Sequence, residues 1–117
     1  MTEYVILLPG NESTWENASE EHRQAMYAKH ADFAKLLEER GHKISGGNEL
    51  QSSKTAKTVR MSGDAVQITE GPYAESVEQV TGYYVVDTDD FDDLLQVCGV
   101  LAGAEGAVEV RGTVTYT

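Results

Sequence analysis

Two segments with helical periodicity, each flanked by segments with strand character, constrain most strongly how this chain of 117 residues can fold. The first predicts a helix over residues 19–40, which Gly41 ends as a C-terminal glycine. Four of its side chains recur at steps of four, three and four residues and share one face: Met26, His30, Phe33 and Leu37. We expect that face to pack against a sheet.

The second helix is predicted to follow the acidic segment 87–90, because carboxylates suit a helix N-terminus. Its apolar stripe consists of four residues: Phe91, Leu94, Leu95 and Cys98. Gly103 and Gly106 are expected to end this helix. Cys98 is predicted to be a packing residue, since it lies on the stripe.

Strand character recurs in the rest of the chain. The predicted strands are residues 4–8, 44–50, 55–61, 65–69, 79–86 and 107–116. The Pro-Gly pair at 9–10 is expected to stop the first strand, and residues 62–64 to turn a hairpin. Residues 11–18 are predicted to form a loop or a short helical turn, with Ser13 and Glu16 spaced as a capping box.

The order strand, helix, several strands, helix, strand is that of a split βαβ, ferredoxin-like domain. No repeat, linker or low-complexity tract interrupts it. We therefore predict one α+β domain over residues 1–117 with an antiparallel sheet. A chain of this length buries only about two-thirds of its unfolded surface, so contact with a second subunit is expected to add stability.

Charge and cysteine content exclude several classes of partner and cofactor. A formal net charge of −11, with only nine scattered Lys and Arg residues, argues against nucleic acid and against an anionic membrane surface. No apolar stretch is long enough to span a membrane and no signal-peptide pattern is present, so a cytoplasmic protein is expected. One cysteine excludes an internal disulfide and a thiolate cluster. His22 and His30 are spaced too widely for a one-turn metal pair, and no metal or other cofactor is predicted.

Residues 70–75 (EGPYAE) follow a predicted strand directly and resemble the motif that names the DGPF branch of the YCII-related family. Further matching pieces occur in the same order along the chain: residues 46–50 (GGNEL), 58–60 (TVR), 82–84 (GYY) and 108–111 (VEVR). The motif differs from the family pattern in having Glu70 for Asp and Tyr73 for Phe. The resemblance covers nearly the whole chain.

The resemblance implies a dimeric α/β barrel, in which the sheets of two ferredoxin-like subunits pack together and enclose clefts. It also implies a proposed active site formed by a His on the first helix and an Asp near the end of the second. Alignment on Gly41 places His30 at the His position. The Asp has no counterpart, because Glu105 is the one acid in residues 100–106.

His30 is the leading catalytic candidate, since imidazole titrates near neutrality and acts as a general acid or base when a carboxylate orients it. The alternative is a half-buried histidine that is hydrogen-bonded within the core. His42 follows the helix-ending Gly41 and is expected to be exposed to solvent.

Three acids near the Gly-Pro turn form a second candidate group. Glu70 and Glu75 are catalytic candidates and Glu78 a ligand-binding one, because crowded carboxylates raise one another's pKa. The alternative is a charged rim or a capped turn. If a site exists, this turn and His30 are expected to face the same cleft.

Three more residues are candidates for ligand binding. Tyr73 and Tyr84 could line a pocket, although aromatic residues in strands are often plain packing. Arg60 could anchor an anionic ligand or neutralise one of the many acids.

These observations lead to three hypotheses of function. The first is a homodimer that binds an unidentified small molecule in a cleft, with His-dependent acid/base chemistry. The second is a non-catalytic regulatory or protein-interaction module, and the third is a structural homo-oligomer without a ligand. The sequence does not decide whether the protein is an enzyme.

Overall fold

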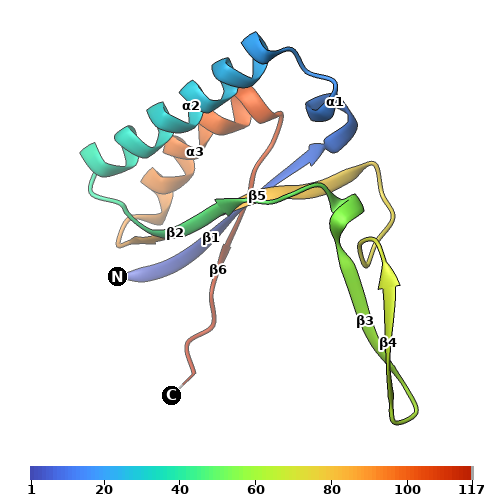
Figure 1. Ribbon diagram of the computed structural model, residues 1–117. Helices are drawn as coiled ribbons and strands as arrows, with labels where there is room; N and C mark the ends of the chain where they lie inside the picture. The colour runs from blue at the N-terminus through green and yellow to red at the C-terminus, as the bar shows by residue number, and fades with distance from the viewer. Residues whose placement is uncertain (117) are drawn as a thin grey trace.

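The computed structural model describes residues 1–116 and has an α+β fold (Figure 1). Its elements in chain order are β1 (Thr2–Asn11), α1 (Glu12–Glu16), α2 (Glu20–Glu39), β2 (Lys43–Glu49), the 3-10 turn η1 (Ser53–Thr55), β3 (Lys57–Ser62), β4 (Ala65–Glu70), β5 (Glu78–Thr88), α3 (Phe91–Glu105) and β6 (Glu109–Gly112). The predicted order of strands and long helices is confirmed. Of the two alternatives for residues 11–18, the short helical turn is present as α1, and η1 is an addition.

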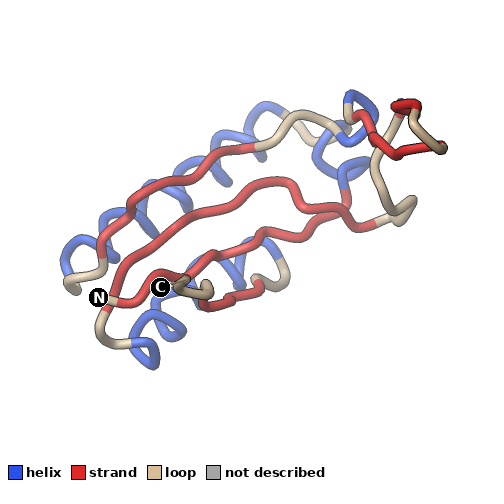
Figure 2. The backbone as a smooth tube through the Cα atoms, turned by 90° about the horizontal axis from the view of Figure 1, so that it is seen from below, coloured by secondary structure: helices blue, strands red, loops and turns tan. Residues whose placement is uncertain are grey.

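Four strands form one antiparallel sheet in the order β2-β5-β1-β6, and β3 and β4 form a separate two-stranded sheet. The helices α2 and α3 lie together over one face of the four-stranded sheet (Figures 1 and 2). No helix of residues 1–116 covers the opposite face, which Figure 2 shows toward the viewer. This arrangement is that of a ferredoxin-like fold, so the predicted fold class is confirmed.

The hydrophobic core lies between the sheet and the two long helices. Side chains alternate along a strand, and Ile6 and Leu8 of β1 and Val86 of β5 are the buried ones on the side of the helices. They join Phe33 and Leu37 of α2, both of which are fully buried. The predicted apolar face of α2 is therefore confirmed.

The apolar face of α3 differs from the predicted stripe. The buried residues are Leu94, Val97, Cys98 and Leu101. Phe91 and Leu95 are instead 37% and 40% exposed, and Phe91 stacks on Tyr4 of β1 with ring centroids 4.6 Å apart. The predicted stripe ends at Cys98, whereas the helix continues to Glu105. Its buried face therefore extends to Leu101 and leaves out Phe91 and Leu95.

Both long helices begin at side-chain caps and end at glycines. Ser19 accepts a hydrogen bond from the backbone N–H of His22 at 3.0 Å, and α2 stops before Gly41, whose φ is +81°. In α3 the cap is Asp90, and Gly106 follows the last residue with φ +97°. The positive φ favours glycine at both ends, so Gly41 and Gly106 end the helices as predicted. Gly103, which was also expected to end the second helix, instead lies within α3.

Two predictions about the first loop are wrong. The Pro-Gly pair at 9–10 does not stop β1, because a register shift between Leu8 and Pro9 accommodates the proline and pairing continues to Asn11. The cap of α1 is Asn11 rather than Ser13, with the Asn11 side chain accepting from the N–H of Thr14 at 3.3 Å.

The last strand is also shorter than predicted. β6 pairs with β1 over four residues, Glu109 to Gly112, although the alternation of valines extends to Val114. Val114 is 73% exposed, because β1 begins at Thr2 and leaves the end of the chain without a full partner strand.

His42 is buried, which contradicts its predicted exposure. Only 4% of its surface is accessible, because the turn at Gly41 places the ring between β5 and the start of α3. Its Nδ1 lies 2.6 Å from the Thr88 hydroxyl and its Nε2 lies 2.7 Å from an Asp93 carboxylate oxygen. Arg40 binds the other oxygen of Asp93. This network joins the end of α2 to the end of β5 and the first turn of α3.

The Asp93 pairing predicts a specific dependence of stability on pH. The hydrogen bond from His42 and the charge of Arg40 lower the pKa of Asp93 below its ordinary value of 3.8. As pH falls, the unfolded chain therefore takes up this proton first. We expect wild type to be more stable than Asp93→Asn above pH 3.8, and that difference to shrink as pH falls through the depressed pKa.

Urea unfolding of both proteins, followed by circular dichroism from about pH 6 to about pH 3, measures this difference. Asp92→Asn is the matched control, because it removes the same charge from the same helical turn. The side chain of Asp92 is exposed and makes no hydrogen bond or ion pair within residues 1–116. If Asp93→Asn lowered the free energy of unfolding by no more than Asp92→Asn at every pH, that result would contradict the structural role of the network.

Candidate functional site

His30 joins three elements of the fold through both nitrogens of its ring. It projects from α2, its Nδ1 lies 2.7 Å from the hydroxyl of Tyr84 on β5, and its Nε2 lies 2.8 Å from a carboxylate oxygen of Glu105 on α3. The three residues, called the His30 triad below, come from positions 30, 84 and 105 of the chain. Only the packing of both helices on the sheet brings them together.

Each member of the triad has a local reason for its position. His30 precedes Phe33 on the sheet-facing side of α2, and Tyr84 alternates with buried Val86 on the helix-facing side of β5. Glu105 is the last residue of α3. A carboxylate at a helix C-terminus opposes the helix dipole, so the hydrogen bond with His30 compensates for an unfavourable placement.

The partners of the ring fix its hydrogen-bonding pattern. A carboxylate only accepts, so Nε2 of His30 carries the proton that is shared with Glu105. In the neutral ring Nδ1 then accepts from the Tyr84 hydroxyl. In the imidazolium Nδ1 donates to the Tyr84 oxygen, and the hydroxyl proton of Tyr84 is free to point at a ligand.

Tyr84 remains a hydroxyl at neutral pH. Burial raises its pKa above the ordinary value of 10.0, and the negative charge of Glu105 raises it further. Its ring packs at 5.9 Å from the ring of His30 and at 5.2 Å from that of Phe33, which holds the hydroxyl in place. Tyr84 therefore serves as a hydrogen-bond donor or acceptor and not as an anion.

Solvent reaches the triad. The side chains of His30 and Glu105 are 22% and 17% exposed. Two surface hollows in residues 1–116 lie elsewhere: one of about 680 Å³ beside His42 and Lys43, and one of about 470 Å³ beside His22. A ligand at the triad would therefore bind at a partly open surface of a single chain.

Glu105 is the member of the triad that the sequence does not assign to His30. It is the one acid in residues 100–106, whereas the family resemblance implies an Asp at this place. The extra methylene of Glu lets a carboxylate at the very end of α3 reach the ring. A usable signal was the acid in the last helical turn, where the helix dipole disfavours it.

The acidic turn lies apart from the triad within one chain. Glu70, Glu75 and Glu78 are all exposed, and none of them contacts His30 within residues 1–116. Glu70 pairs with Lys57 across the β3–β4 hairpin, while Glu78 is the first residue of β5. The structure brings His30 and Tyr84 together but leaves the three acids on the hairpin side.

The two other predicted ligand-binding residues contact each other. The guanidinium carbon of Arg60 lies 5.6 Å from the centre of the Tyr73 ring, in a cation–π arrangement. Tyr73 is 83% exposed, so both residues are accessible at the base of the hairpin.

Possible metal ligands are dispersed in the described chain. Residues 1–116 contain no group of three or more His, Cys, Asp or Glu side chains placed to hold a metal ion. Burial raises the pKa of the Cys98 thiol to about 11, which agrees with its predicted packing role. No helix among the described residues is both long enough and apolar enough to cross a membrane.

Comparison with known proteins identifies relatives over nearly the full chain. The family model of the YCII-related domain matches residues 2–112. An uncharacterized protein of Rhizobium meliloti is 28% identical over 116 residues, which cover 97% of this chain and 93% of that protein.

The hydrogen bond between Tyr84 and His30 predicts a difference between two neighbouring tyrosines. Tyr84→Phe should lower the free energy of unfolding by about 1 kcal/mol, because it removes the partner of a half-buried ring nitrogen. Tyr83→Phe is the matched control, since the Tyr83 hydroxyl makes no hydrogen bond within residues 1–116. Its effect should stay within about 0.5 kcal/mol. Equal losses for the two variants in urea unfolding would show that the hydroxyl of Tyr84 adds nothing.

Proposed function

Because this chain belongs to the YCII-related domain family, we propose that it binds a small molecule beside the His30 triad and exchanges a proton with it through His30. One observation supports this proposal above all: the two nitrogens of His30 are held by a hydroxyl at 2.7 Å and a carboxylate at 2.8 Å. A ring oriented by a carboxylate is the usual arrangement of a histidine that acts as general acid or base.

Each residue of the triad has a distinct proposed role. As a base, His30 takes the hydroxyl proton of Tyr84 at Nδ1 while Tyr84 takes one from the ligand, and Glu105 stabilises the resulting imidazolium. When His30 acts as an acid, the two transfers are reversed. Tyr84 donates its hydroxyl proton to the ligand and takes up the Nδ1 proton of the imidazolium. Tyr84 is thus the group that touches the ligand, and Glu105 is a positioning residue.

The proposal includes a homodimer. The face of the sheet that no helix covers presents Val5 and Leu7 of β1 next to their paired residues Val85 and Tyr83 of β5. This apolar centre suits contact with the same face of a second copy. The predicted residues Arg60, Tyr73, Glu70, Glu75 and Glu78 lie away from His30 in one chain, so they are not part of the proposed ligand site at the triad.

An alternative function is a non-catalytic regulatory or protein-interaction module. The location of both surface hollows away from His30 favours it. In that case the triad fastens the end of α3 to β5 and carries out no chemistry. The cytoplasm is the proposed location for either function, in keeping with a single buried cysteine that is not in a disulfide.

The ligand proposal predicts that binding depends on His30 and not on its neighbour along the helix. Wild type, His30→Gln and the control His22→Gln are each mixed with a fixed library of small polar metabolites and examined by saturation-transfer NMR. His22 is exposed on the same helix, and its ring makes no hydrogen bond within residues 1–116. We expect at least one compound to bind wild type and the control, and to bind His30→Gln about tenfold more weakly or worse.

The same compounds test proton transfer directly. In heavy water, wild type should speed the exchange of a ligand C–H proton for deuterium, and His30→Gln should lose that effect while His22→Gln keeps it. Binding without exchange would support the non-catalytic alternative. Equal binding by all three proteins would contradict a ligand site at His30.

The homodimer predicts a mass near twice 12.8 kDa in light scattering. The measurement is made over a series of dilutions, because an interface of standard size, about 800 Å² per partner, survives to low concentration. A mass that stays at that of one chain throughout the series would contradict the dimer.

A further inference from the structure

We infer that the β3–β4 hairpin, residues 57–70, is an arm that packs on a second copy of this chain. The inference deepens the homodimer of the proposed function and rests on it for the identity of the partner. It does not depend on the chemistry of His30. The hairpin is called the arm below.

The arm has one apolar and one polar face. The cross-strand pairs Val59–Ile68 and Met61–Val66 share a face, and all four side chains are 61–63% exposed. The other face carries Thr58, Arg60, Gln67 and Thr69. This strict alternation is the pattern of a strand pair with one buried side, but nothing in residues 1–116 buries that side.

The protein exposes more surface to solvent than a compact monomer of its mass does. The accessible surface is 7997 Å², whereas a compact monomer of 12.8 kDa exposes about 6,300 Å². The excess of about 1,700 Å², which includes the end of the chain after β6, is larger than the roughly 800 Å² that each partner buries in a standard interface. The radius of gyration is likewise 16.5 Å, against about 13 Å for a compact domain of this length.

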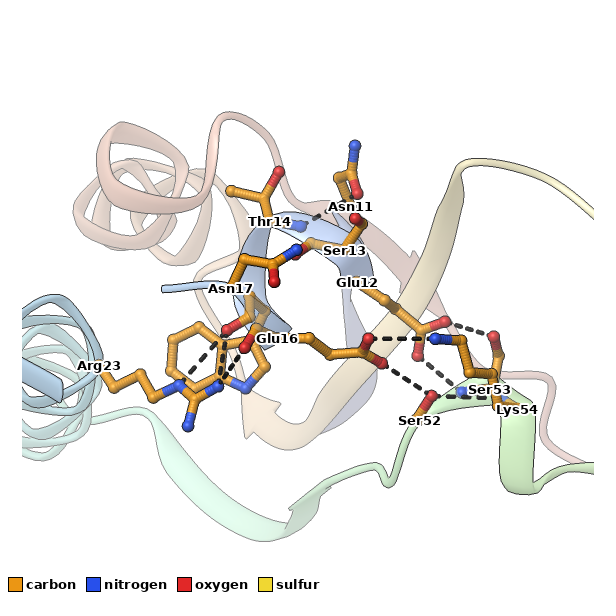
Figure 3. A network of polar contacts seen from close by, with 11 residues as sticks. Asn11, Glu12, Ser13, Thr14, Glu16, Asn17, Arg23, Ser52, Ser53 and Lys54 are labelled. Atoms are coloured by element: carbon orange, nitrogen blue, oxygen red, sulfur yellow. Dashed lines mark hydrogen bonds and ion pairs between the residues drawn. The ribbon is translucent and has the colours of Figure 1, made fainter. Parts of the chain in front are cut away.

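The base of the arm is held firmly by α1 (Figure 3). Glu12 accepts from the backbone N–H of Ser53 at 2.7 Å, and Glu16 accepts from the hydroxyl of Ser52 at 3.1 Å and from the ammonium group of Lys54 at 3.3 Å. Lys54, followed by Ser52, lowers the pKa of Glu16.

On the other strand the chain is tied back as it leaves the arm. The N–H of Gly71 donates to the carbonyl of Ala56 at 2.7 Å, and the Thr58 hydroxyl donates to the carbonyl of Gly71 at 2.8 Å. A two-stranded hairpin alone is marginally stable in water. An arm with both ends fixed is therefore held in a set direction, ready for a partner.

Charge favours a second copy of this chain as the partner. Residues 54–70 carry three of the nine basic side chains, Lys54, Lys57 and Arg60, but only two of the twenty acidic ones, Asp64 and Glu70. The arm and its base thus have a net charge of about +1, while the rest of the chain holds the acidic excess. Because the arm carries no excess of negative charge, it can approach the acidic remainder of another copy. The acidic remainders of two copies would repel each other.

The direction of the arm agrees with this partner. Figure 1 shows it leaving the four-stranded sheet on the side opposite α2 and α3, and Figure 2, viewed from that side, shows the arm end-on. A second copy that covers the open sheet face would therefore lie beside the arm. One contact would bury the apolar face of the arm together with the centre of the sheet.

A pair of adjacent substitutions tests the arm. Ile68→Asp places a charge on the apolar face, and Gln67→Asp places the same charge on the polar face of the same strand. Sedimentation velocity over a dilution series should show that Ile68→Asp weakens dimerisation about tenfold or more, with Gln67→Asp within about twofold of wild type. Equal dimerisation of wild type and Ile68→Asp would overturn the arm inference and leave the homodimer of the proposed function standing.

Hydrogen exchange of the unmodified protein covers the case in which Ile68→Asp unfolds the arm. Amides of residues 57–70 should exchange more slowly at high protein concentration than at low concentration. Rates that are independent of concentration would overturn the inference. If the wild type stayed monomeric at every concentration, both the arm inference and the homodimer would be overturned. The ligand assays with His30→Gln test the triad separately.

Discussion

The packing of α2 and α3 on one face of a four-stranded sheet is the constraint on which the rest of this structure depends. Phe33 and Leu37 of α2 and Leu94 and Leu101 of α3 are fully buried, and Ile6 from the centre of the sheet meets them. Burial of one such side chain contributes about 1.5–3 kcal/mol, so this layer fixes the angle and register of both helices. The polar contacts at each end of the layer follow from that register.

Two buried or half-buried histidines mark the two ends of the helical layer, and their surroundings differ in an informative way. His42 is 4% exposed, and its partners Thr88 and Asp93 occupy both nitrogens of its ring. Its network connects the end of α2 to β5 and α3 and has a structural role. His30 has an equally complete set of partners but remains 22% exposed, beside a tyrosine that stays protonated. Access to solvent therefore separates the candidate site from the structural network.

The candidate site and the uncovered apolar surface lie on opposite sides of the molecule. The side of the helices carries the His30 triad, and the opposite side carries the open sheet face and the arm. A chain that stayed alone would leave Val59 and Ile68 exposed to water and the apolar centre of the sheet only half-buried. A shared interface between copies would explain both exposed features with one contact, and would leave the triad of each subunit accessible.

The sequence by itself determined the elements and their order, because periodicity, caps and terminal glycines act over a few residues: Ser19 and Gly41 bound α2 as predicted. Only the tertiary structure decided what those elements bring together. Glu105 meets His30 across 75 positions of the chain, and His42 turns inward to Asp93. Neither contact has a local signature, since each depends on how the helices are rotated and spaced on the sheet, and that is set by the shape of the whole core.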